Sequence, residues 1–228
     1  MRRLFSCLFL LVLGLMGPSA GRTQDASVPL GIGRWTVRYL RNGLYLDFDQ
    51  VPLVRGGLVQ VFSTNYAKGY YGSSSSNARP TVEALPDGGR AYTTLFTYAA
   101  GAQKFTATQR IEVHPSNTVT FALRYRWDGP EPALLEWNAA RLWNYPLVGA
   151  IYQATHAGEI PPTHGSVGPL PRASQYPADS LAPLWRALTF QETAFGPLSL
   201  SVGAGEPAEG VLFDGRDDAF LRDEKLFW

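Results

Sequence analysis

The sequence predicts an all-β fold, a large antiparallel β-sandwich of about ten or more strands. Composition is the first reason. Aromatic residues make up 13% of the chain and charged residues only 17%, while 23 glycines and 17 prolines supply turns. Aromatic and β-branched side chains suit a pleated, half-buried surface. The second reason is an alternation of apolar and polar residues with the period of two that is typical of strands.

The clearest alternation runs from Gln103 to Trp127. Apolar side chains occupy most alternate positions as far as Val113, a Pro-Ser-Asn turn follows, and the pattern resumes at Val119. Successive side chains of a strand point to opposite faces. We therefore expect a long hairpin, with its Val, Phe, Leu, Tyr and Trp side chains on one buried face and its Thr and Arg side chains in water.

The earlier elements show the same pattern. Trp35 to Tyr39 and Leu44 to Phe48 alternate on either side of Arg41-Asn42-Gly43. Asn-Gly between two such runs is the strongest short-range hairpin signal, because both central residues of the favoured turn need a positive φ. Further strands are expected at Val51 to Tyr71, Thr81 to Leu85 and Arg90 to Ala99.

The later elements are shorter. Ala133 to Thr155 could be read at helical spacing, but its aromatic content and its neighbours favour a strand with a bend near Asn144-Tyr145-Pro146. His156 to Pro183 is rich in proline and predicts one long loop. Short strands are expected at Trp185 to Thr193, Leu198 to Val202 and Val211 to Asp214. The apolar end, Leu226 to Trp228, either closes the sheet or begins a further part of a longer chain.

The N-terminus predicts export. Arg2-Arg3, an apolar run from Leu4 to Met16 and small residues up to Ala20 are typical of a secretory signal peptide. The run is too short to span a bilayer, which takes about 20 residues. We expect a signal peptide at 1–20, a tether at 21–30 and the β-sandwich at 31–228, truncated at its C-terminal end if the chain continues. The one cysteine, Cys7, lies in the leader, so a secreted or periplasmic bacterial protein without disulfides is expected.

Several function classes are disfavoured. The formal net charge of +1 provides no electrostatic footprint for nucleic acid. The chain contains no P-loop, Gly-x-Ser-x-Gly elbow, His-Glu-x-x-His pair or calcium loop. We therefore expect no cofactor and no metal.

Aromatic residues beside polar ones favour a carbohydrate ligand. Sugars present apolar CH faces that stack on indole and phenol rings, and their hydroxyls bind neighbouring planar polar groups. Ordinary core packing is the competing explanation for such rings. The residues that we predict to bind a glycan are Tyr70, Tyr71, Trp127, Trp137, Asn138, Arg141 and Trp143.

Glu136 is the best candidate for a catalytic acid. A carboxyl group beside indole rings can have a raised pKa, and Glu136 precedes Trp137 directly. Glycoside hydrolysis needs a second carboxylate, for which Asp214 or Asp217 is the candidate. The alternative is structural: Glu136 would pair with a nearby arginine across the sheet, and the two aspartates would belong to a turn.

Three segments carry a family resemblance: Val51-Pro52-Leu53-Val54-Arg55-Gly56, Lys68-Gly69-Tyr70-Tyr71 and Glu136-Trp137-Asn138-Ala139-Ala140-Arg141-Leu142-Trp143. Together they resemble the galactose-mutarotase-like supersandwich domains of exported bacterial carbohydrate-active proteins, which often precede a catalytic barrel. The resemblance implies a β-sandwich, association with sugars and a downstream catalytic domain or partner chain. The family's catalytic glutamate and two histidines are not matched, so its catalysis does not carry over.

These observations favour a secreted, non-catalytic glycan-binding or accessory module of a glycoside hydrolase. The first alternative is a glycoside hydrolase or sugar epimerase that uses Glu136 with Asp214 or Asp217. The second is a structural envelope or assembly protein whose strand edges pair with partners.

Overall fold

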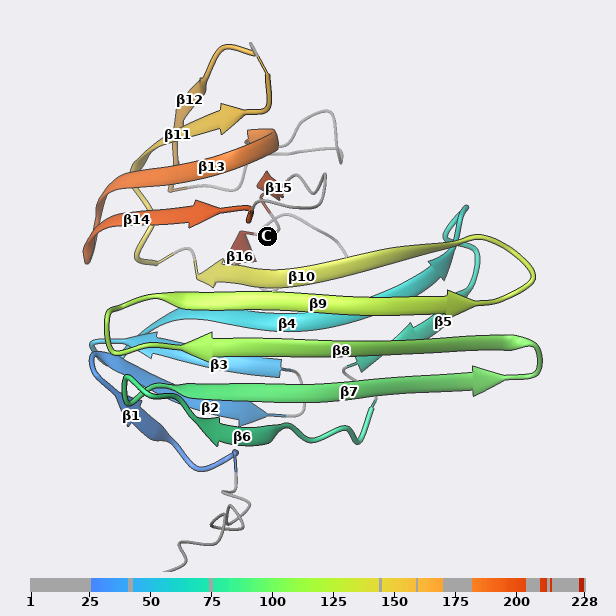
Figure 1. Ribbon diagram of the computed structural model, residues 1–228. Coiled ribbons are helices and arrows are strands. Elements are labelled where there is room, and N and C mark those ends of the chain that lie inside the picture. Colours follow the sequence, from blue (N-terminus) through green and yellow to red (C-terminus); the bar gives the residue numbers. More distant parts are fainter. Residues whose placement is uncertain are drawn as a thin grey trace, which may run out of the picture.

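The computed structural model describes residues 26–40, 43–73, 76–143, 145–158, 160–169, 182–203, 210–212, 214 and 226–227. These residues form sixteen strands in three antiparallel sheets (Figure 1), which confirms the predicted all-β class. The expected signal peptide at 1–20, with Cys7, lies outside the described residues, and so do Asp217 and Trp228.

Sheet A holds seven strands. They are β1 (Leu30–Ile32), β2 (Trp35–Leu40), β3 (Gly43–Phe48), β4 (Val51–Ser63), β5 (Gly69–Gly72), β10 (Ala133–Trp143) and β16 (Leu226–Phe227). Their order is β1-β2-β3-β4-β10-β16, and β5 also pairs with β4. The predicted first hairpin is confirmed, because β2 and β3 pair from Trp35 opposite Phe48 to Leu40 opposite Gly43.

Sheet B holds four strands in sequence order, and they are β6 (Thr81–Ala84), β7 (Arg90–Ala100), β8 (Gln103–Val113) and β9 (Val119–Asp128). The predicted central hairpin is confirmed, because β8 and β9 pair from Val113 opposite Val119 to Phe105 opposite Trp127. One of its side chains departs from the expectation. Tyr125 belongs to the apolar series of β9 but is 59% exposed.

Sheet C holds β11 (Ile151–His156), β12 (Thr163–Ser166), β13 (Ala182–Thr193), β14 (Gly196–Ser201) and β15 (Gly210–Leu212). The prediction of one loop from His156 to Pro183 is wrong in its first part, because β12 pairs back onto β11. Pro161 and Pro162 lie in the connection before β12, and β12 itself contains no proline that would remove a ladder donor.

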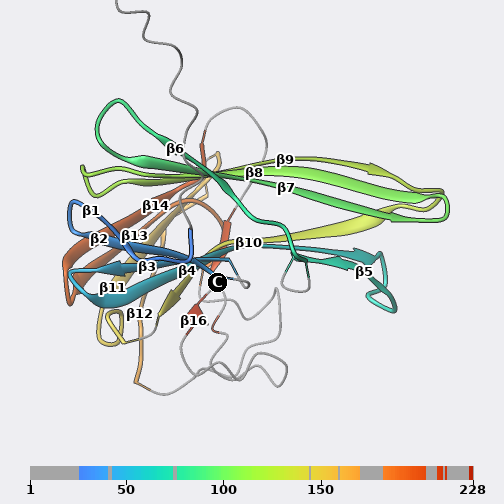
Figure 2. The ribbon, with the colours of Figure 1, turned by 90° about the horizontal axis from the view of Figure 1, so that it is seen from below.

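Sheets A and B face each other as the two layers of a sandwich (Figure 2), and sheet C lies beyond β10 at one half of it (Figure 1). The larger core fills this half. Leu44 and Leu46 of sheet A, Ile111 of sheet B and Phe190 of sheet C are fully buried in one cluster. Three sheets therefore enclose the larger core.

A second, smaller cluster fills the other half, where only sheets A and B are present. Its buried members are Val59, Val61, Phe96, Phe105 and Ala107.

The buried side chain of Gln109 lies at the inner edge of this half, where its Oε1 accepts a hydrogen bond of 3.1 Å from Trp137 Nε1. Gly57 provides the room, because a Cβ there would lie 2.6 Å from Gln109 Nε2 and its φ of +82° suits only glycine.

Candidate functional site

Aromatic rings gather at the end of the sandwich where the β4–β5, β7–β8 and β9–β10 turns lie together (Figures 1 and 2). We call Tyr70, Tyr71, Tyr98, Phe105 and Trp127 the aromatic tip. The ring centroids of Tyr70 and Trp127 are 5.3 Å apart, as are those of Tyr71 and Phe105, and Tyr71 lies 6.3 Å from Tyr98. These separations are those of favourable aromatic pairs.

Trp127 reaches this end because it lies near the end of β9 and is held by the turn that follows. Its Nε1 donates a hydrogen bond of 2.9 Å to the carbonyl oxygen of Glu131. The indole also covers Gly129, where a Cβ would lie 2.5 Å from Trp127 Cζ2. A side chain at this position would clash with the indole, so glycine allows the Trp127 ring to lie against the turn.

A β-bulge positions the two tyrosines of β5. Phe62 pairs with Gly69 and Val61 pairs with Tyr71, so Tyr70 is the extra residue of the β4–β5 ladder. A bulge interrupts the strict alternation of side chains. As a result Tyr70 and Tyr71, although adjacent in sequence, both pack against the cluster between the sheets.

The rings of the aromatic tip differ in exposure. Phe105 is 1% exposed and forms its floor, whereas Tyr70, Tyr98 and Trp127 are half-buried. Tyr71 is also half-buried. Burial raises the pKa of the Tyr71 phenol, so the phenol stays neutral at physiological pH.

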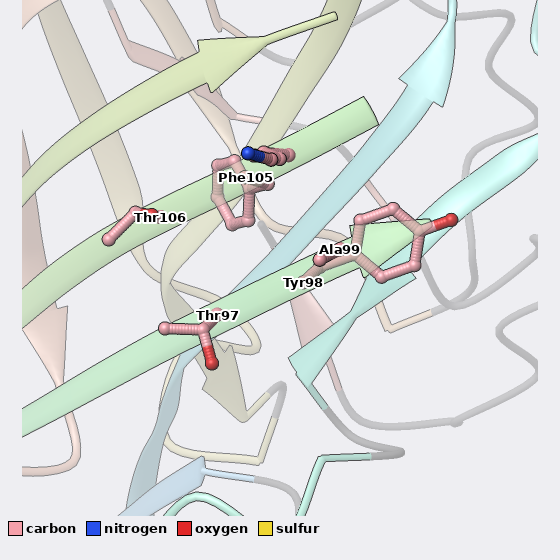
Figure 3. A pocket seen from close by; sticks show the side chains of 6 residues that line it. Thr97, Tyr98, Ala99, Phe105 and Thr106 are labelled. Atoms are coloured by element: carbon pink, nitrogen blue, oxygen red, sulfur yellow. The ribbon is translucent and has the colours of Figure 1, made fainter. Parts of the chain in front are cut away.

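A shallow pocket of about 260 Å³ lies at the same end, over the β7–β8 hairpin. Its lining consists of Thr97, Tyr98, Ala99, Lys104, Phe105 and Thr106. Figure 3 shows that the labelled side chains come from two neighbouring strands, with Thr97 and Tyr98 on one and Phe105 and Thr106 on the other. The exposed Thr97, Ala99, Lys104 and Thr106 side chains lie on the outer face of the hairpin, whereas the Tyr98 and Phe105 rings point to its inner face, so the pocket presents hydroxyl and ammonium groups on the side away from the aromatic tip.

The structure places the predicted glycan-binding residues in three settings. Tyr70, Tyr71 and Trp127 come together in the aromatic tip. Trp137 packs against the same cluster, and its indole N–H donates a hydrogen bond to Gln109 Oε1. Asn138 lies opposite Leu58 at the next position of β10, on the other face of the strand.

Arg141 and Trp143 lie at the far end of β10, away from the aromatic tip. Arg141 is 4% exposed and stands opposite Arg55, and Trp143 pairs with Leu226 of β16. Neither residue belongs to the cluster around the tip.

The predicted carboxylates lie in different sheets. Glu136 is half-buried on β10 of sheet A, opposite Gln60 rather than the arginine that the structural alternative expected. Asp214 follows β15 of sheet C and is 1% exposed. Asp217 falls outside the described residues, so its role stays a prediction.

Two residues of the aromatic tip were missed by sequence reasoning: Tyr98 and Phe105. Tyr98 and Phe105 are direct cross-strand partners in the β7–β8 hairpin. The alternation of apolar residues in both strands could have predicted this pair, because it places Tyr98 and Phe105 on one face once the turn at Gly101 is recognised.

The described residues contain no group of three or more His, Cys, Asp or Glu side chains placed to hold a metal ion. Within the same residues, no helix has the length and apolar character that crossing a bilayer demands. No protein-family model matches the chain, and neither a curated protein nor a solved structure shows significant similarity to it.

Proposed function

We propose that this chain is an exported, non-catalytic domain that binds a glycan through its aromatic tip. The observation that carries the proposal is the contact between Tyr70 and Trp127, whose ring centroids lie 5.3 Å apart although the residues come from different sheets. Both rings are half-buried, so each keeps part of its surface in water.

Half-buried rings suit a sugar because the CH face of a pyranose can replace water on the exposed part of the ring. The bulge at Tyr70 and the hydrogen bond from Trp127 to Glu131 fix these rings before the ligand arrives. Preorganisation of this kind lowers the entropy lost on binding.

Burial of Asp214 favours binding over hydrolysis. A second catalytic carboxylate has to reach the scissile bond, and Asp214 is only 1% exposed. The resemblance to supersandwich domains supports the same role, that of an accessory module of a glycoside hydrolase.

The test is an oligosaccharide array on the full chain, followed by calorimetric titration of the strongest ligand with Tyr70→Ala and Trp127→Ala. We expect each variant to weaken binding at least about fivefold, because stacking on an aromatic ring contributes on the order of 1–3 kcal/mol.

Tyr145→Ala is the matched control, since Tyr145 is 75% exposed and does not belong to the aromatic tip. It should bind like the wild type. The proposal is wrong if no glycan binds, or if the two variants of the aromatic tip retain full affinity.

A further inference from the structure

Strand β10 has one edge that is paired along its length and one that is not. On one side it pairs with β4 from Ala133 to Leu142. On the other side, among the residues that the structure describes, only Leu142 and Trp143 are paired, and their partner is β16. Within the part of the chain that the structure describes, the ladder of this second edge therefore ends at Leu142.

Hydrogen bonding of β4 shows where the backbone groups of β10 point. The N–H groups of Val59 and Ser63 both donate on the β5 side of β4, to Ser73 Oγ and to the carbonyl oxygen of Lys68. In an antiparallel ladder, the residue opposite Val59 then points its own N–H and C=O away from β4. That residue is Trp137, and by the same alternation Leu135 points the same way. Their donors and acceptors face the second edge.

Apolar surface lies beside this edge. Leu135 and Trp137 turn their side chains toward sheet B, where they pack against the smaller cluster between sheets A and B. Above them in sheet B, Leu123 and Trp127 pack against the same cluster, but Tyr125 between them is 59% exposed. A strand placed beside β10 would cover Tyr125 with its inward side chains.

The edge of β9 is different. It carries Arg124 and Arg126, and the second of these forms an ion pair of 2.8 Å with Asp128. Charged side chains of this kind protect an edge from pairing with another chain. From Ala133 to Ala140 the only charged residue of β10 is Glu136. Edge protection is thus present on β9 and weak on β10.

We propose that the second edge of β10, from Ala133 to Ala140, binds an extended segment of a separate polypeptide as an added antiparallel strand. Strand β16 already lies antiparallel on the same edge, so the added strand continues its register. The segment would carry apolar side chains at alternate positions, facing Leu135 and Trp137, and polar ones between them.

A second copy of this chain fits less well. Sheet C projects beyond β10 on the side of the second edge, and it spans the depth of the sandwich (Figures 1 and 2). Two-fold pairing of β10 with β10 of another molecule would bring each sheet C against the other sandwich. A single extended strand avoids this clash.

The test uses a fluorescent peptide in which four valines alternate with threonines, with a lysine at each end. Valine and threonine favour strands, and the pattern places valine opposite Leu135 and Trp137. We expect saturable binding to the full chain by fluorescence anisotropy. The same peptide with N-methylated valines should lose that binding, because its valine N–H groups supply the bonds to β10.

Tyr125→Lys is the variant that tests the location. An inward-pointing lysine is a natural means of blocking an added strand, so we expect the affinity to fall at least about tenfold. Arg124→Ala, at the neighbouring outward position, should leave it unchanged. The high exposure of Tyr125 makes the variant compatible with folding, and the N-methylated peptide tests the proposal without any mutation.

Hydrogen exchange should show slower exchange of the Leu135 and Trp137 amides when the peptide is bound. Equal binding of the methylated peptide, or unchanged affinity of Tyr125→Lys, would overturn the proposal. A dimer that Tyr125→Lys dissociates would also overturn it, by assigning the edge to a second copy. Retained glycan binding by Tyr125→Lys separates this test from that of the aromatic tip.

Discussion

The two halves of the sandwich differ in what encloses them. At one half sheet C adds a third layer, and residues such as Leu44, Ile111 and Phe190 are completely buried. At the other half two sheets alone enclose a smaller cluster, around which Tyr70 and Trp127 remain half-buried. The first half therefore carries most of the stability, and the second keeps aromatic surface accessible for recognition.

The largest difference should appear when one ring is removed from each half. Phe190→Ala is expected to cost about 3–5 kcal/mol of unfolding free energy, because it leaves a cavity among three sheets. Tyr70→Ala should cost about 1–2 kcal/mol, because a half-exposed ring removes less surface from water. Urea unfolding followed by tryptophan fluorescence measures both. Equal costs would contradict the division into a stabilising half and a recognition half.

Trp127 and Trp137, which both pack against the smaller cluster, allow a matched comparison of unfolding free energies. Trp137 donates its indole N–H to the buried Gln109, whereas Trp127 donates to the backbone of Glu131 at the surface. Trp137→Phe should therefore cost about 1–3 kcal/mol more than Trp127→Phe, since it leaves a buried acceptor without a donor. In Trp127→Phe, water replaces the indole as the hydrogen-bond donor to the exposed carbonyl oxygen of Glu131. Similar unfolding free energies for the two variants would show that Gln109 finds another partner.

The enclosed half should also respond to alkaline pH. Burial raises the pKa of Tyr92 to about 12. An unfolded chain releases this proton near pH 10, so stability is unaffected below about pH 10 and falls as the pH rises from about 10 to 12. Tyr92→Phe should reduce this fall, measured as the unfolding free energy at several pH values. Part of the fall should remain, because burial also raises the pKa of Tyr39 and Tyr71. An unchanged slope would mean that Tyr92 ionises in the folded state as it does in the unfolded state.

The smallest change in unfolding free energy is expected at the charged edge strand β9. Arg126 and Asp128 form an ion pair whose side chains are 77% and 48% exposed. Exposed pairs contribute little, so Arg126→Ala should change the unfolding free energy by less than about 0.5 kcal/mol. A larger loss would assign a packing role to the stem of Arg126.

Local patterns in the sequence predicted the local parts of the fold. The alternation from Phe105 to Trp127 fixed the β8–β9 hairpin, because a period of two and a turn determine its register. The Asn-Gly turn did the same for β2 and β3. Both are contacts between neighbours in the chain.

Contacts between segments that lie far apart in the sequence could not be predicted from these local patterns. Nothing in the residues near Tyr70 indicates that its ring meets Trp127, because that contact depends on the packing of two sheets. Alternation placed Tyr125 on the buried face, but its side chain is 59% exposed and no described strand covers it. Likewise, prolines around Thr163–Ser166 suggested a loop where the chain forms β12.

The most direct test of the recognition half is an NMR titration of the full chain with the strongest glycan from the array, observing the indole N–H signals. The account predicts a saturable shift of the Trp127 signal and little change for Trp35, which is 5% exposed in the enclosed half. Shifts centred on Trp35, with Trp127 unmoved, would place recognition in the other half and contradict it.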